Sequence, residues 1–159
     1  PRSTLFPYTT LFRSIMRDLA NRLVSVNTVD PKVITSDTNG TGVDLKGFES
    51  AMVVYSVGIE GDTLSGSVKF EIHLEHSDDN VTFTAVTAST DVTNGTVNSD
   101  GTFVTLDDNA ESPSVHEIGY LGGKRYIRVV VDATGSHSNG TPMAAVVIKG
   151  NPLDSQDSD

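Results

Sequence analysis

The chain contains no cysteine and no tryptophan, and only 6% of its residues are aromatic. Without cysteine it forms no disulfide, offers no thiolate nucleophile and supplies no thiolate ligand for zinc. Flat sugar-binding surfaces usually present exposed aromatic side chains. The scarcity of aromatics therefore weighs against a carbohydrate-binding role.

Basic residues are also scarce. The sequence has 11 Lys and Arg against 21 Asp and Glu, which gives a formal net charge of -10 at pH 7. Binding to a phosphate backbone requires clustered Lys and Arg, so we expect no nucleic-acid partner. The acidic balance favours solubility and partners or ions that are positive.

Patterns of membrane spans and of common active sites are missing as well. No apolar run approaches the ~20 residues that a spanning helix requires, and we find no G-x-S-x-G or comparable catalytic motif. His73 and His76 are three apart on one expected strand, so they point to opposite faces and are wrongly placed to share a metal. We expect no membrane association, no enzymatic activity and no cofactor.

The residues that are present favour strands and turns. Thr, Ser, Gly, Asn, Asp and Val dominate, while Leu is scarce, as is typical of β proteins. The clearest strand is predicted over 67–76, where Val68, Phe70, Ile72 and Leu74 alternate with polar residues. Such alternation predicts one face in the core and one in water.

A second pattern predicts a β-hairpin. Strand-like segments at Val115–Leu121 and Lys124–Asp132 are separated by Gly122 and Gly123. Glycine tolerates the positive φ that a tight two-residue turn requires, so we expect these glycines to close the hairpin.

These segments together predict an all-β fold. The other expected strands or extended pieces are 32–36, 43–45, 51–59, 82–86, 102–106 and 143–149. About eight strands separated by turn clusters favour a two-sheet antiparallel β-sandwich or jelly roll, with a short N-terminal arm or helix.

The expected organisation is one domain with short extensions. Residues 1–14, PRSTLFPYTTLFRS, resemble a translated sequencing-adapter peptide, so Met16 is the expected natural start. Removing Arg2 and Arg13 from the 11 basic residues leaves 9 against 21 acidic ones, a net charge near -12. We expect an N-terminal arm over 15–32, the sandwich over 33–150 and an acidic, flexible tail over 151–159.

The arm and a basic cluster are the candidate partner-binding segments. Leu19 and Leu23 recur at helical spacing, which predicts either a short helix over 16–26 or an extended arm that reaches a neighbour. Lys124, Arg125 and Arg128 form the densest basic cluster. They are expected either to bind an acidic partner or to lie on a solvated strand edge, where their charge prevents unwanted strand pairing.

Two acidic pairs are weak candidates for calcium binding. Asp78 and Asp79 precede an asparagine, and Asp107 and Asp108 lie elsewhere in the chain. Calcium requires several convergent oxygen ligands, and the spacing does not match an EF-hand loop. Ordinary turn chemistry, in which Asp bonds its own backbone, is the favoured interpretation, so we expect no metal.

Four segments carry a resemblance to a known family. They are 42–45 leading into an apolar strand, 68–76 ending in Ser-Asp-Asp-Asn, 119–129 with its Gly-Gly and Arg-Tyr-Ile-Arg-Val motifs, and Asn-Gly-Thr-Pro at 139–142 before the last strand. From Val33 to Gly150 the chain is similar to small jelly-roll cement, or decoration, proteins of tailed-phage capsids.

The resemblance implies a non-catalytic virion protein that decorates and stabilises the capsid. Its partner would be the major capsid protein, its own assembly a homotrimer, and its location the capsid surface after synthesis in the host bacterial cytoplasm. Two alternatives remain open. One is a carbohydrate- or receptor-binding sandwich, which Tyr120 and Tyr126 support as aromatic residues that could contact a sugar. The other is a head–tail or tail structural protein.

Overall fold

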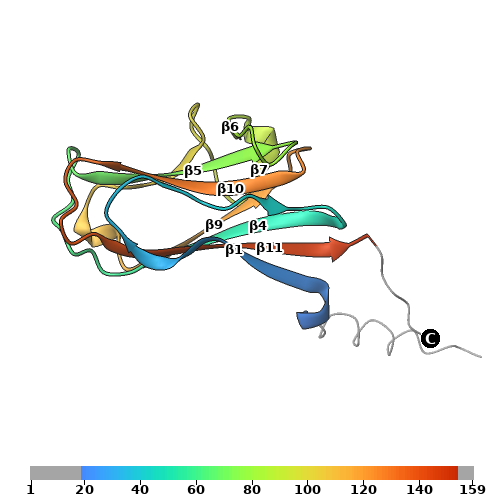
Figure 1. Ribbon diagram of the computed structural model, residues 1–159, viewed down its shortest axis with the longest axis horizontal. Coiled ribbons are helices and arrows are strands. Elements are labelled where there is room, and N and C mark those ends of the chain that lie inside the picture. The colour runs from blue at the N-terminus through green and yellow to red at the C-terminus, as the bar shows by residue number, and fades with distance from the viewer. Residues whose placement is uncertain (1–18, 154–159) are drawn as a thin grey trace, which may run out of the picture.

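The computed structural model describes residues 19–153, whose regular secondary structure is almost entirely β-strand (Figure 1). The strands are β1 (Leu23–Ile34), β2 (Thr38–Asn39), β3 (Val43–Asp44), β4 (Phe48–Val57), β5 (Lys69–Ser77), β6 (Thr84–Ala85), β7 (Val92–Thr93), β8 (Thr102–Leu106), β9 (Ser114–Tyr120), β10 (Tyr126–Thr134) and β11 (Thr141–Pro152). Three short 3-10 helices are η1 (Ala20–Arg22), η2 (Ser89–Asp91) and η3 (Asn109–Glu111). No helix within 19–153 is long and apolar enough to cross a bilayer.

The strands form two antiparallel sheets stacked as layers (Figure 1). The first sheet has the order β1-β11-β4-β9-β7, and the second has the order β2-β10-β5-β6, with β3 also on β10 and β8 also on β5. If β2 with β3, and β6 with β8, count as interrupted single strands and the two-residue β7 is set aside, eight strands remain, four in each sheet, and their order in the two sheets is that of a jelly roll. The predicted all-β sandwich is confirmed.

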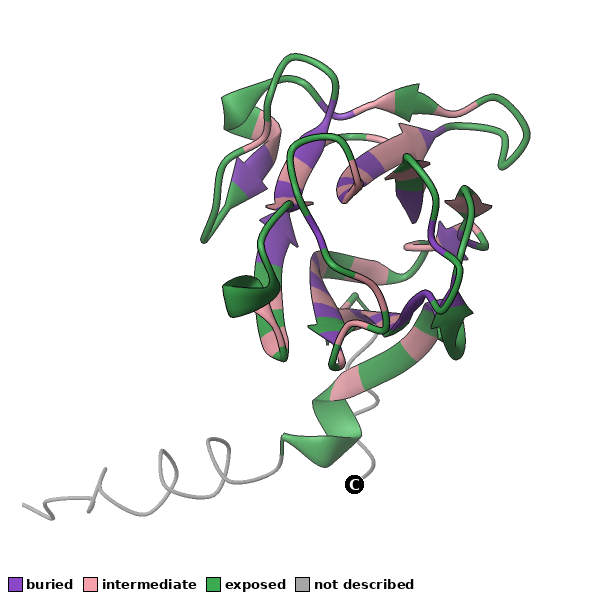
Figure 2. Cartoon of the chain, turned by 90° about the vertical axis from the view of Figure 1, so that its left-hand side faces the viewer, coloured by how far each residue is buried: buried purple, intermediate pink, exposed green. Residues whose placement is uncertain are grey.

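The core lies between the sheets and follows from the alternation in the sequence. Phe70, Ile72 and Leu74 of β5 are fully buried, while the residues between them are partly exposed. Val53 and Tyr55 of β4 meet them from the other sheet and are also fully buried. Figure 2 shows this striping of buried and partly exposed positions along the strands.

The predicted hairpin between β9 and β10 is wrong. β9 pairs with β4 and β7 in the first sheet, whereas β10 pairs with β5, β2 and β3 in the second. Gly122 and Gly123 therefore connect the two sheets, and neither has the positive φ of a tight primed turn. Alternation shows which face of a strand is buried, but it does not show which neighbour the strand pairs with.

Replacing Gly123 with alanine is expected to leave stability unchanged or to raise it by up to about 1 kcal/mol. A Cβ at this position would meet no atom within 4 Å, and the unfolded chain would lose conformational freedom. Urea denaturation measures the effect. The matched control is Gly140→Ala, where φ is +68° and the Cβ would lie 2.5 Å from the Ile34 carbonyl oxygen; this variant should be clearly destabilised. Strong destabilisation by Gly123→Ala would restore the tight-turn prediction.

The N-terminal prediction also needs correction. From Leu23 onward the chain is β1, not a helix, and β1 pairs with β11 from Leu23 opposite Gly150 to Ile34 opposite Thr141. The predicted boundary between arm and sandwich, after residue 32, thus falls inside a strand. Asn151 and Pro152, assigned to the tail, end β11. The predicted leader 1–14, the remainder of the arm before residue 19, and residues 154–159 lie outside the described residues.

Candidate interaction face

The outer face of the second sheet is charged. We call its β5 and β10 residues Lys69, Glu71, His73, Glu75, Arg128 and Asp132 the charged face. They pair with one another: Lys69 Nζ lies 2.8 Å from Glu71 Oε2, His73 Nε2 lies 3.2 Å from Asp132 Oδ2, and Arg128 Nη2 lies 2.7 Å from Glu75 Oε2. The Lys69–Glu71 and Arg128–Glu75 ion pairs are completed within the chain and leave little unmet charge for a partner.

Arg128 shows how a charge on this face is paired within the chain. Its Nε also donates to Glu75 Oε2 at 2.7 Å, and its guanidinium lies over the Phe83 ring at 4.2 Å from the centroid. Directed pairing and a cation–π contact hold the side chain in place. The predicted partner-binding residue Arg128 thus has its partners inside the chain.

The outer face of the first sheet is different, because it is apolar. We call the residues Val33, Met52, Val54, Val115, Pro142, Ala144, Val146 and Ile148 the apolar face. Their strand neighbours Val53, Tyr55, Ala145 and Val147 are buried in the core, so these side chains point outward. All eight are partly or largely exposed.

The strand register makes the apolar face continuous. Val54 lies directly opposite Val146, and Met52 lies opposite Ile148. Across the next strand pair Val54 faces Glu117, which is the single charged residue at the outward positions of β4, β9 and β11. A sheet with both faces apolar exposes hydrophobic surface to water, and such contiguous surface marks an interaction site.

A shallow groove of about 400 Å³ lies at one end of this face. Its lining residues are Pro31, Lys32, Val33, Ser56, Gly58, Pro142, Met143 and Ala144. Val33 is 55% exposed, and Val115, also at this end of the face, is 62% exposed. The groove offers a mostly apolar recess into which a partner side chain could insert.

Sequence reasoning missed this face, although the signal was present. The segments 51–59 and 143–149 are apolar at both odd and even positions, and both were predicted only as strands. A strand in an antiparallel sandwich needs apolar residues on one side only. Apolar residues on both sides therefore indicate either a second layer or a partner.

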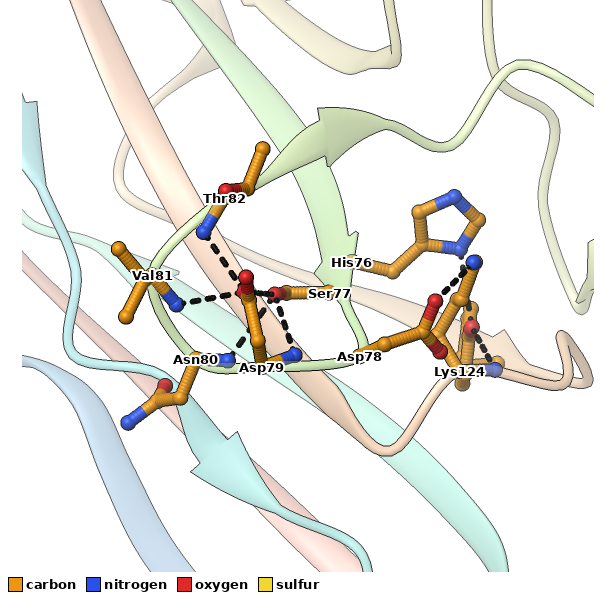
Figure 3. Close-up of polar contacts among 9 residues, drawn as sticks. His76, Ser77, Asp78, Asp79, Asn80, Val81, Thr82 and Lys124 are labelled. Carbon is orange, nitrogen blue, oxygen red and sulfur yellow. Dashed lines mark hydrogen bonds and ion pairs between the residues drawn. The ribbon is translucent and has the colours of Figure 1, made fainter.

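The predicted residues Lys124 and Arg125 lie at the connection between the sheets and are each paired. The Lys124 ammonium contacts the Asp78 carboxylate (Figure 3). Arg125 donates to Asp44 from Nε at 3.0 Å and from Nη2 at 2.7 Å. These pairs join segments that are distant in sequence, so both cations have a structural role.

The Arg125 pair predicts a measurable titration. Hydrogen bonding from Arg125 lowers the pKa of Asp44 from 3.8 to about 2. Because the pKa is depressed in the folded state, the stabilisation is complete above pH 3.8 and is lost as pH falls through about 2. In Arg125→Gln the Asp44 pKa, followed by carboxyl NMR, should return toward its ordinary value. Arg128→Gln, the control, should leave it unchanged; an equal rise in both variants would assign the shift to net charge.

The four calcium candidates do not converge. Asp79 Oδ1 accepts hydrogen bonds from the backbone N–H groups of Thr82 at 2.7 Å and Val81 at 2.9 Å, and from Ser77 Oγ at 2.8 Å (Figure 3). These bonds, with that from Thr82 largest, hold the Asp79 pKa well below its usual range. The turn interpretation therefore fits this carboxylate.

The second acidic pair lies elsewhere in the sandwich. Asp108 caps η3 by accepting from the Ala110 N–H at 2.8 Å. Asp107 directly follows β8, whose Leu106 pairs near the start of β5, whereas Asp78 follows the end of β5. No group of three His, Asp or Glu residues within 19–153 is arranged to hold a metal ion.

The remaining predicted residues are Leu19 and Leu23, at or just before the start of β1, and Tyr120, at the end of β9. Leu19 is 65% exposed beside η1, and Leu23 is partly buried at the start of β1. Tyr120 is 3% exposed, and its hydroxyl lies 2.9 Å from His76 Nδ1 and accepts from the Lys124 N–H at 3.1 Å. A buried Tyr120 offers no platform for a sugar, and this removes one of the two tyrosines that supported the carbohydrate alternative.

Comparison with known proteins gives no family assignment. A scan against protein-family models finds no match to this chain, and a search of curated proteins finds no similar sequence. Functional argument therefore depends on the two contrasting sheet faces.

Proposed function

We propose that this protein is a non-catalytic structural protein of a phage virion, which docks on the capsid through its apolar face and stabilises the shell. The observation that carries the proposal is the contrast between the two outer faces. One is apolar and nearly free of charge, and the other has most of its charges paired internally.

The architecture suits a cementing role. A two-sheet body with a close-packed apolar core is rigid, so contacts made on one face are transmitted across the protein without internal rearrangement. The apolar face would be buried against the partner, where removal of apolar surface from water drives association. The charged face would remain in solvent and keep the decorated particle soluble.

The proposed partner is the major capsid protein of a tailed phage, and the proposed location is the outer surface of the virion. A partner surface that fits would be apolar at its centre with few acidic groups, because Glu117 and the acidic net charge of the chain would repel carboxylates. The head–tail and tail alternatives would use the same face on another virion protein.

A binding experiment tests this function. The purified protein would be mixed with capsids assembled from the major capsid protein of a tailed phage, and sedimented. Co-sedimentation at a fixed stoichiometry, together with a rise in capsid melting temperature, is the expected result. Absence from capsids but recovery with purified tails would move the site to the tail. Recovery with neither particle would overturn the proposal.

A further inference from the structure

The four sheet edges of the sandwich are unequal. β7 ends the first sheet on one side with two residues, and β2, β3 and β6 on the second sheet have two residues each. β8 has five. β1, at the remaining edge, has twelve. Short edge strands are a common protection against unwanted pairing, because they present few free backbone groups. β1 is too long to be protected in this way.

The second half of β1 is protected in other ways. Register shifts interrupt its pairing with β11 between Asn27 and Val29 and between Val29 and Lys32. The Thr28 carbonyl accepts the Thr41 N–H at 2.7 Å, so a neighbouring segment already uses that part of the edge. Bulges, a proline and charged residues within 28–34 further discourage pairing.

The first half of β1, Leu23–Asn27, has none of these protections. It pairs with β11 in unbroken register, from Gly150 to Val146, and contains no charged residue or proline. Val24 is 42% exposed. Within residues 19–153 no strand pairs with its outer side. An unguarded, uncharged strand edge is a template for the addition of another strand.

We infer that this edge pairs with the same edge of a second copy and forms a twofold-symmetric dimer. An antiparallel pair centred on Ser25 places Val24 of each copy opposite Val26 of the other, and Leu23 opposite Asn27. No like charges meet across this pair. That matters for a chain with net charge -10, whose copies repel each other elsewhere.

The symmetry follows from pairing this edge with itself. An antiparallel pair of two identical stretches, Leu23–Asn27 of each copy, is related by a twofold axis. Each copy then uses its own edge once, so the assembly closes at two copies. This dimer differs from the trimer that the family resemblance implies. It uses the edge of the first sheet, not its apolar face, and it stands independently of the proposed function.

Charge complementation at Ser25 tests the inference, because that residue meets its own copy at the twofold axis. The full chain should sediment as a dimer. Ser25→Asp alone and Ser25→Lys alone should each weaken dimerisation about tenfold, since like charges then face each other. An equimolar mixture of the two variants should recover the dimer. Ser136→Asp, in an exposed loop, is the control for added charge and should dimerise as the unmodified chain does.

Other results would contradict either the inferred dimer or the proposed function. A monomer or a trimer for the unmodified chain, or a dimer that neither Ser25 variant weakens, would overturn it. Capsid binding that is lost in both Ser25 variants of a monomeric chain would assign the edge to a capsid strand instead. Failure of capsid binding with an intact, Ser25-dependent dimer would overturn the proposed function alone.

Discussion

Replacing Phe70 with alanine is expected to lower the free energy of unfolding by about 3–5 kcal/mol, the usual range for a buried phenylalanine. Phe70 is fully buried near the start of β5, and its ring stacks on His137 with 3.9 Å between centroids. The sandwich cannot collapse around the lost ring, because strands on both sides hold their register through backbone hydrogen bonds. Domains of this kind have about 5–15 kcal/mol of total stability, so the loss is a large fraction of the whole.

The appropriate measurement is urea denaturation monitored by far-UV circular dichroism. Tryptophan fluorescence cannot monitor unfolding, because the chain has no tryptophan. The melting temperature should fall by roughly 10 °C. Ile59→Ala serves as the control, because Ile59 is 73% exposed; its effect should stay within about 0.5 kcal/mol. A loss below about 1 kcal/mol for Phe70→Ala would contradict the placement of Phe70 in the shared core.

Replacing Val146 with glutamate is expected to weaken capsid binding about a hundredfold or more. Val146 lies in the middle of the apolar face, directly opposite Val54. If that face is buried on the capsid, the new carboxylate would lose water without gaining a partner, and about 3 kcal/mol of lost binding energy corresponds to a hundredfold weaker affinity. The isolated fold should lose little stability, because the side chain is partly exposed on the outer face.

Thr134→Glu is the matched control for Val146→Glu. Thr134 is exposed on the outer side of β10, opposite Lys69, so the same charge is added to the opposite sheet. Quantitative co-sedimentation with capsids should show normal binding for Thr134→Glu. Equal losses in both variants would show that net charge governs binding and that the apolar face is not the docking surface.

Parts of the fold were predictable because they depend on local patterns. The predicted strand over 102–106 matches β8, and the alternation over 67–76 correctly assigned Phe70, Ile72 and Leu74 to the core. Turn residues were also informative, since Asp79 bonds the backbone of its own turn as expected for Asp in that position. Each of these features involves residues close in sequence.

The candidate site was only partly predictable. Lys124, Arg125 and Arg128 were identified as a cluster, but their partners Asp78, Asp44 and Glu75 come from distant segments. A sequence shows that charges are present without showing which of them meet. The apolar face required both β4 and β11 to be placed side by side before Val54 and Val146 became one surface.

The sequence by itself determined that this is a cysteine-free, acidic β protein, and it determined which side of most strands faces the core. Only the tertiary structure decided that β9 and β10 belong to opposite sheets and that the chain from Leu23 is a strand rather than a helix. The reason is physical. The side-chain period of a strand is local, whereas its hydrogen-bonding partners are chosen by packing between segments far apart in the chain, as when β1 pairs with β11.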